Sequence, residues 1–269
     1  MVKKILKDEF YFILYIWRSI LKPLFKFKEI AVLMYHSVEA NDWPLSVDPA
    51  VFDRQMKYLK NKNYCVISLA DIVDYLEGGR QLANKTIAIT FDDGYLDNYL
   101  NAYPILKKYN LPATIFTATK DDRSIGCASP YPLFNWLQAK EMSSGGLISI
   151  ESHSHSHPNL KLLPPDELEQ EIGRSVEKIK SQLNYQSRIF AYPGGRFSQQ
   201  VIDCLKMHGF KAGFSTNEGL IRKNDNMFKL TRISVHRSVT FFAFKVRLTK
   251  AIDWYATILR WLRIRGIVS

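Results

Sequence analysis

From residue 30 to residue 235, the chain alternates short apolar runs, rich in β-branched and aromatic residues, with stretches of helical periodicity. This alternation is typical of parallel strands joined by crossover helices. We expect strands at 30–35, 86–91, 113–117, 147–150, 188–192, 209–214 and 230–235. About seven strands with intervening helices favour an α/β fold, a closed, irregular (β/α) barrel, over an open doubly wound sheet. A chain of 269 residues has room for one such barrel with short additions at its ends.

Capping and turn residues divide the segments between these strands into helices. Ser68 is a suitable N-cap, and the helix that it starts should end at Gly78 and Gly79. Other helices are predicted over 49–64, up to Asn110, from 164 to 179 and over 198–207. The stretch 120–146 lacks such a pattern, and we expect an irregular insertion there that faces the substrate.

Polar residues follow most of the predicted strands. They are His36, Asp92, Asp93, His153, Tyr192, Pro193 and His236. Barrels of this class keep their chemistry at the carboxyl ends of the strands. Residues that lie far apart in the sequence are therefore expected to meet in one cleft.

Asp92 and Asp93 stand side by side in the run 90–95 (TFDDGY), directly after an apolar strand. Two adjacent carboxylates near a core are costly in free energy unless a cation or a proton compensates them. Asp-Asp-Gly is also a common polar turn, so this motif alone does not establish a site.

Three histidines occupy alternate positions in 151–158 (ESHSHSHP). A single histidine is more often structural, but a cluster after a buried strand is a candidate site for zinc or a similar ion. Two neutral imidazoles and one carboxylate leave coordination positions open for water and substrate, as a catalytic site requires. The ion would lower the pKa of the bound water and polarise an acyl oxygen, while the second aspartate takes the proton.

Together the two motifs resemble those of the polysaccharide deacetylases, also called the NodB-homology or carbohydrate esterase family 4 group. The first motif of that family is Thr-Phe-Asp-Asp-Gly, and the resemblance implies that Asp92 is the general base and Asp93 a metal ligand. It also implies a barrel fold and a hydrolase that removes an acyl group from an N-acylated sugar. The implied cofactor is a divalent metal ion, with zinc the first candidate.

The histidine run resembles the second motif of the family, His-Ser/Thr-x-x-His. This resemblance implies that His153 and His157 are the two imidazole ligands. His155 falls on a variable position of the motif and is kept as a substitute ligand.

Residues 190–195 (FAYPGG) resemble the third motif, in the form found among deacetylases of poly-N-acetylglucosamine exopolysaccharides. The more common form has an arginine at the position of Ala191, where it orients the base. Arg232 or Arg196 can take that part, and the sequence does not choose between them. The residues expected to contact the substrate are Tyr192, Pro193, Arg196 and Arg232.

The family also needs a histidine acid that protonates the leaving amine. Residues 33–38 (LMYHSV) resemble the Tyr-His motif that opens the circularly permuted exopolysaccharide subgroup, which implies that His36 is the acid. Residues 233–236 (ISVH) are similar to the Leu-x-x-His motif, so His236 is the alternative. The backbone N–H of Tyr95 is the implied oxyanion donor.

Most of the net charge of +11 lies at the two ends of the chain. Residues 1–29 form a basic amphipathic segment with seven Lys and Arg against three acids, and residues 241–269 form a basic amphipathic helix with six against one. The catalytic domain is expected over 30–240. Such ends suit the surface of an anionic membrane, and the alternative is that they only pack on the barrel.

The apolar run 10–17 is shorter than the roughly 20 residues that span a bilayer. Asp8 and Glu9 precede it, where a secretory signal has only basic residues. We therefore expect a peripheral protein at the cytoplasmic face of the membrane, with an extracytoplasmic protein held by an uncleaved anchor as the alternative. No nucleic-acid-reading motif accompanies the basic residues, so nucleic acid is not an expected partner, and no protein partner can be inferred.

Two classes of function fit these motifs. The first is removal of an N-acetyl group from an amino sugar in a glycan or a lipid-linked glycan, or from extracellular polysaccharide or peptidoglycan. The second is a catalytically impaired barrel that only binds glycans, which the altered third motif would permit.

Overall fold

The computed structural model describes residues 29–120, 131–249, 252–253 and 257. Its eight strands in this part of the chain all pair in parallel. The strands are β1 (Ala31–Tyr35), β2 (Cys65–Val66), β3 (Thr86–Phe91), β4 (Ala113–Thr117), β5 (Ile148–Ser152), β6 (Ile189–Ala191), β7 (Ala212–Glu218) and β8 (Leu230–Ser234).

Seven of these strands close into a barrel, in the order β1-β8-β7-β6-β5-β4-β3, with β3 returning to β1. The closing pair runs in register from Ala31 opposite Ile87 to Tyr35 opposite Phe91. β2 lies outside this ring and pairs only with the start of β3. The predicted barrel of parallel strands is therefore confirmed, and the carboxyl ends of β1 and β3 lie next to each other.

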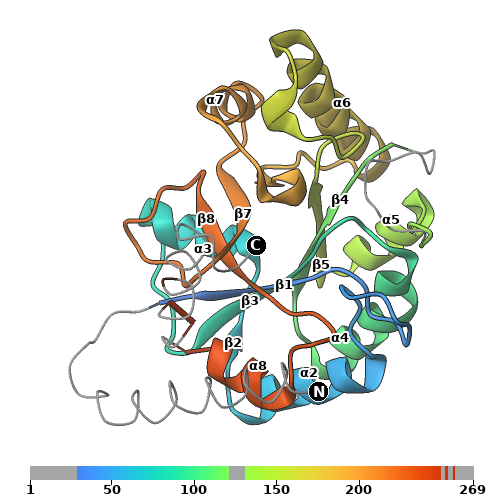
Figure 1. Cartoon of the computed structure of the whole chain (residues 1–269), viewed down its shortest axis with the longest axis vertical. Coiled ribbons are helices and arrows are strands. Elements are labelled where there is room, and N and C mark those ends of the chain that lie inside the picture. Colours follow the sequence, from blue (N-terminus) through green and yellow to red (C-terminus); the bar gives the residue numbers. More distant parts are fainter. Residues whose placement is uncertain (1–28, 121–130, 250–251, 254–256, 258–269) are drawn as a thin grey trace, which may run out of the picture.

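Helices surround the barrel (Figure 1). They are α2 (Pro49–Asn61), α3 (Leu69–Glu77), α4 (Tyr103–Tyr109), α5 (Trp136–Ser144), α6 (Pro165–Leu183), α7 (Gln199–Met207) and α8 (Phe241–Arg247), with the π-helix η1 (Asn98–Ala102) and the 3-10 turns η2 (Leu160–Leu162) and η3 (Pro193–Gly195). α3 begins and ends where its sequence predicts. Ser68 and Asp71 form a capping box, and Gly78 ends the helix with φ 93°.

The inside of the barrel is filled by side chains from strands that are not neighbours. Phe116 of β4 and Phe214 of β7 have ring centroids 6.1 Å apart, although two strands separate them in the sheet. The guanidinium carbon of Arg232, on β8, lies 5.5 Å from the centroid of the Phe116 ring. An arginine therefore crosses the barrel interior, which requires a buried acceptor for its charge.

The prediction of an irregular insertion over 120–146 was wrong for its second half, which contains α5. Asn135 and Gln138 form a capping box at the start of this helix, and Ala139 and Met142 are buried beneath it. The helix has only this narrow apolar contact, so the hydrophobic periodicity of the segment is weak. Residues 121–130 lie outside the described part of the chain.

The structure describes only part of the two basic terminal segments, 1–29 and 241–269. α8 packs against α2, with the rings of Tyr58 and Phe244 6.4 Å apart, so the first turns of the segment 241–269 belong to the barrel. Arg222 forms ion pairs with both Glu29 and Asp253, which brings together the two ends of the described chain. Residues 1–28 and 258–269 lie outside the described part. No helix of the described residues combines the length and the apolar character that crossing a bilayer needs.

Candidate active site

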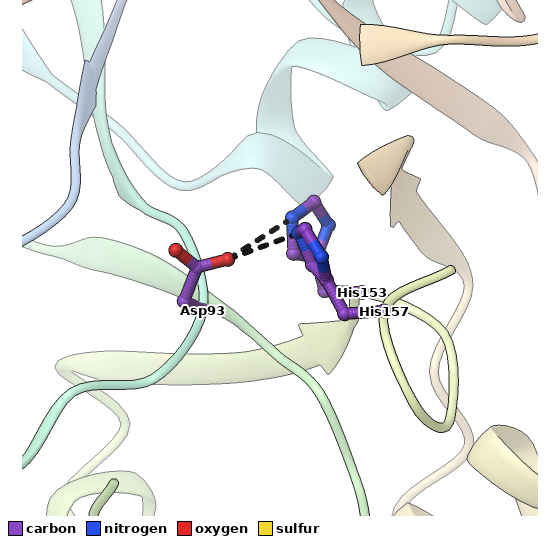
Figure 2. Close-up of side chains that lie close together, drawn as sticks. All are labelled: Asp93, His153 and His157. Atoms are coloured by element: carbon purple, nitrogen blue, oxygen red, sulfur yellow. Dashed lines mark ion pairs between the residues drawn. The ribbon is translucent and has the colours of Figure 1, made fainter. Parts of the chain in front are cut away.

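Asp93, His153 and His157 meet beyond the carboxyl ends of β3 and β5 (Figure 2). Oδ1 of Asp93 is 3.5 Å from Nε2 of His153 and 3.3 Å from Nε2 of His157. One ligand atom from each of the three residues lies within 4.8 Å of the other two. The structure thus brings together the three residues that were predicted to hold the ion.

The surroundings of these three side chains fit a divalent cation. Oδ1 of Asp93 is buried and accepts no hydrogen bond from any described residue, which is costly unless a cation compensates it. Its other oxygen, Oδ2, accepts a hydrogen bond of 2.8 Å from the Tyr95 hydroxyl. Nδ1 of His153 is 2.7 Å from the carbonyl oxygen of Ala191, so it donates there and leaves the Nε2 lone pair for an ion. Two imidazoles and one carboxylate also leave coordination positions open.

The backbone at this site is held in the left-handed region at several positions. Asp93 has φ 71° and His157 has φ 60°, which is uncommon for residues other than glycine. Gly94, between Asp93 and Tyr95, has φ 83°, and a Cβ there would lie 2.5 Å from Oγ1 of Thr117. A glycine is therefore required at this position, and the turn that it permits aims Asp93 at the histidines.

Glu171 of α6 organises the loop that carries the histidines, a role that no sequence pattern indicates. Its Oε2 accepts the backbone N–H groups of His155 (3.1 Å) and Ser156 (2.8 Å), and its Oε1 accepts the Ser156 hydroxyl (2.7 Å). Nδ1 of His155 lies 3.0 Å from Oγ1 of Thr119. His155 is therefore outside the ion-binding cluster and does not replace His153 or His157.

Asp92 is paired with Arg232, which answers the question of what orients it. Nη1 and Nη2 of Arg232 donate to Oδ1 and Oδ2 of Asp92 at 2.6 and 2.7 Å, and Nε donates to the carbonyl oxygen of Ser215 at 3.0 Å. Arg232 is completely buried. Its guanidinium therefore faces Asp92 and not a substrate, which corrects its placement among the substrate-contacting residues and favours the orienting role.

The site keeps both carboxylates charged and one imidazole neutral. Burial acts to raise the pKa of Asp92, but the charge and hydrogen bonds of Arg232 together with the nearby imidazoles outweigh it, and the pKa is lowered. Burial also acts to raise the pKa of Asp93, and the contact with His157 and the nearby imidazoles lower it well below the usual value. Burial lowers the pKa of His153 to about 4, so this imidazole is neutral at pH 7, the form that binds a metal ion.

Both candidate acids lie near the carboxyl ends of adjacent strands, β1 and β8. His36 directly follows β1, and the backbone N–H of Asp92 donates to the carbonyl oxygen of Tyr35 at 3.0 Å. His36 is close enough to act electrostatically on both Asp92 and Asp93. Nδ1 of His236 is 3.2 Å from the Ser238 hydroxyl.

An aromatic side chain that the sequence did not single out lies beside this group. Trp43 packs edge-on against Tyr95 (ring centroids 5.3 Å apart) and His36 (6.5 Å), and lies 5.6 Å from the ring of Tyr131. Trp43 stands in a loop without regular hydrophobic spacing, so only the folded structure reveals its position.

The third motif contributes to the core and not to an open surface. Tyr192 is completely buried, and its hydroxyl donates to the carbonyl oxygen of Phe228 at 2.9 Å. Pro193 is buried as well, whereas Arg196 is exposed. The predicted contact of Tyr192 and Pro193 with a substrate finds no support in this packing, and the contribution of the motif to the site is the Ala191 carbonyl that holds His153.

Comparison with known proteins gives a consistent result. The family model described as polysaccharide deacetylase matches residues 79–213. YxkH of Bacillus subtilis (strain 168), named as a polysaccharide deacetylase, is 33% identical over 216 residues, which are 80% of this chain and 75% of that protein. The poly-beta-1,6-N-acetyl-D-glucosamine N-deacetylase of Staphylococcus aureus (strain MRSA252) is 30% identical over 200 residues, 71% of this chain and 68% of that protein.

Solved structures agree with these relatives. The Streptococcus pyogenes deacetylase PplD in complex with acetate superimposes with a TM-score of 0.75 and 28% identity, and the match covers 83% of this chain and all of that one. The chain belongs to the polysaccharide deacetylase family, whose members are metal-dependent hydrolases that act on amide bonds.

Proposed function

We propose that this protein removes the N-acetyl group from an amino sugar within a glycan, with zinc as its cofactor. The observation that carries the proposal is the buried cluster of Asp93, His153 and His157 beside an Asp92 that Arg232 holds by both oxygens. A bare glycan-binding barrel has no need for a carboxylate oxygen that is buried without a hydrogen bond. The catalytically impaired barrel is therefore the less favoured alternative.

Each residue has a defined part in this reaction. Asp93, His153 and His157 hold the ion, which when bound supplies Lewis acidity that activates water and polarises the acyl oxygen. Asp92 takes the proton of the attacking water, and its pairing with Arg232 keeps it ionised and oriented. His36 gives a proton to the nitrogen of the sugar as the carbon–nitrogen bond breaks. The backbone N–H of Tyr95 is the oxyanion donor.

His36 is preferred to His236 as the acid because of its place beside the carboxylates. It follows the strand that pairs with β3, and it lies within electrostatic range of both Asp92 and Asp93. Replacing each histidine by alanine and measuring amide hydrolysis separates the two. The larger loss is expected for His36→Ala.

Acetate release tests the activity itself. The purified protein, loaded with zinc, is incubated with short N-acetylglucosamine oligomers. The masses of the oligomers are measured by mass spectrometry before and after the incubation. Loss of one acetyl mass from the oligomer is expected for the wild type and not for Asp92→Asn. Oligomers that bind but keep their acetyl groups with every divalent metal tested would instead favour the glycan-binding barrel.

A lipid-linked glycan at the cytoplasmic face of the membrane is the substrate setting that we propose. Support comes from the basic composition of both ends, and from Arg222, which holds Glu29 and Asp253 together where these ends join the barrel. Fractionation and binding to anionic lipid vesicles, with and without residues 1–28, test this setting. A protein found outside the cytoplasmic membrane would favour an exopolysaccharide or peptidoglycan substrate.

A further inference from the structure

The segment that follows the two catalytic carboxylates also holds the segment that carries His36. Asp97 lies just before η1, and Asn98 is the first residue of that π-helix. Both are buried, at 7% and 1% exposure. Asp97 and Asn98 thus form a second buried polar group, a few residues after Asp92 and Asp93 in the sequence. The proposed reaction does not use this group.

Three consecutive residues after β1 are fixed by this polar group. Nδ2 of Asn98 donates to the carbonyl oxygen of His36 at 2.8 Å. Oδ2 of Asp97 accepts the Ser37 hydroxyl at 2.7 Å, and Oδ1 accepts the backbone N–H of Val38 at 2.8 Å. Nδ2 of Asn98 also lies 2.9 Å from Oδ1 of Asp97, so the two side chains hold each other.

The arrangement continues along η1 and around the loop. Asn101 donates to the carbonyl oxygen of Val38 at 2.8 Å. The Ser46 hydroxyl donates to that of Ser37 at 3.0 Å, and Val47 donates to the Ser37 carbonyl at 2.9 Å. A single-turn π-helix is rare and occurs frequently at functional sites. Here it places Asn98 and Asn101 so that both reach the loop after β1.

Burying the Asp97 carboxylate costs free energy, and the hydrogen bonds that offset this cost hold the loop firmly. A buried carboxylate loses its hydration, and only several hydrogen bonds to it offset that loss. A loop that only connects β1 to α2 does not need an acid of this kind, because water can satisfy its backbone. Proton transfer does need a fixed distance, since a misplacement of about 1 Å can cost about 100-fold in rate.

We propose that Asp97 and Asn98 are positioning residues that hold His36 at the right distance from Asp92 and the ion-binding cluster. The proposed base Asp92, the proposed ligand Asp93 and the pair Asp97–Asn98 that supports the acid then belong to one continuous segment. A shift of this segment would move all of them together. This inference rests on the proposed role of His36 as the acid that protonates the leaving amine.

Two substrates with different leaving groups separate this role from a structural one. An amine leaves from an N-acetyl sugar only with a proton from the acid, whereas 4-nitrophenyl acetate releases a phenolate that needs none. Both hydrolyses need the ion and Asp92. A residue that positions the acid therefore affects the amide alone, and a residue that only supports the fold affects both substrates equally.

Asp97→Ala is the main variant. We expect kcat for the N-acetylglucosamine oligomer to fall about 100-fold, within the range for general acid catalysis, and the rate with 4-nitrophenyl acetate to change by less than about threefold. Asp97→Asn should recover most of the amide rate, because its amide group can still accept from Val38 and donate to Ser37. Asn98→Ala, which removes the hydrogen bond to His36 directly, should show the same selective loss if Asp97→Ala does not fold.

Asp71→Ala is the matched control. Asp71 is also an aspartate that accepts hydrogen bonds from a backbone N–H and a serine hydroxyl, but it caps α3. Its loss should lower the melting temperature and leave both reactions of the folded protein unchanged. Metal content is measured for every variant.

The outcomes are distinguishable. His36→Ala with equal losses on both substrates, or with no loss on the amide, would show that the assignment of the acid fails, and the inference would fall with it. His36→Ala with a selective amide loss, together with Asp97→Ala and Asn98→Ala that lower both rates equally or neither, would leave the proposed function intact and overturn the positioning role.

Discussion

Asp92 and Asp93 leave the same strand and are both buried, but their carboxylate oxygens have different partners. Asp92 has a guanidinium nitrogen on each oxygen, at 2.6 and 2.7 Å. Asp93 has one oxygen on the Tyr95 hydroxyl and the other facing two imidazoles with no hydrogen bond. The partner of the first comes from β8, across the barrel interior, whereas the second contacts Tyr95 of its own turn and the histidines that follow β5.

This difference is consistent with the proposed roles of Asp92 as the base and Asp93 as a metal ligand. Each oxygen of an ionised carboxylate has two lone pairs, so Asp92 keeps acceptor capacity for a proton while Arg232 fixes its plane. Asp93 instead presents one oxygen to the two imidazoles, where a bound cation can satisfy it. Changes on the Asp93 side should therefore alter metal affinity, and changes on the Asp92 side should alter turnover with the metal in place.

Asp93→Ala should have the largest effect. It removes a ligand and leaves two imidazoles, so we expect metal affinity to fall by more than the roughly 10- to 100-fold that outer-contact changes cost, and amide hydrolysis to be lost. Plasma mass spectrometry after gel filtration measures the retained zinc. A variant with a full equivalent of zinc would show that the three residues do not form the ion site.

Asp92→Asn should lower turnover without lowering metal binding. The amide has nearly the same shape but cannot take a proton, so kcat is expected to fall about 1,000-fold, within the range for general base catalysis. Zinc content should equal that of the wild type. A loss of zinc comparable to that of Asp93→Ala would contradict the division into base and ligand.

Arg232→Lys should lower turnover about 100-fold, because one ammonium cannot replace a bidentate guanidinium and the base is then misplaced. Arg232 lowers the pKa of Asp92 mainly by its charge, which lysine keeps, so the neutral Arg232→Gln is the variant in which that pKa should rise and the acidic limb of kcat/KM move to higher pH. The exposed Arg174 on α6 is the control position, and Arg174→Gln should leave the pH profile unchanged. An unmoved acidic limb in Arg232→Gln would argue against Asp92 as the base.

Tyr95→Phe should have the smallest effect of the four. Oδ2 of Asp93 loses its donor, so zinc affinity is expected to fall about 10-fold while kcat at saturating zinc changes little. Competition with a zinc chelator measures this affinity. Tyr99→Phe, whose hydroxyl bonds Glu141 at the surface, is the control and should bind zinc as the wild type does.

The ion ligands were predictable because they stand in short motifs directly after predicted strands. The rule that parallel strands present their carboxyl ends at one rim places both aspartates and the histidine run together, and the choice of Asp93, His153 and His157 among them follows from family resemblance. α3 was predictable for a similar reason, since the signals at Ser68 and Gly78 are local. The predicted roles of His36 and of the Tyr95 backbone follow from family resemblance and stay predictions.

Contacts between distant segments were not predictable in this way. Arg232 and Asp92 lie 140 positions apart, and their pairing depends on β8 and β3 flanking β1. Tyr192 stands next to motif residues, yet it points into the core, because a short strand does not reveal which face is buried. The boundaries 1–29, 30–240 and 241–269 stay a prediction, although α8 packs on the barrel.

Because β1 pairs with both β3 and β8, the barrel closes only after β8 has been synthesised. A growing polypeptide contains Asp93, His153 and His157 once residue 157 has been made, but Arg232 of β8 is added 75 positions later. Until then β1 keeps one open edge, and the base has no guanidinium beside it. In a nascent chain, the residues proposed to bind the ion are thus made well before the arginine that holds Asp92.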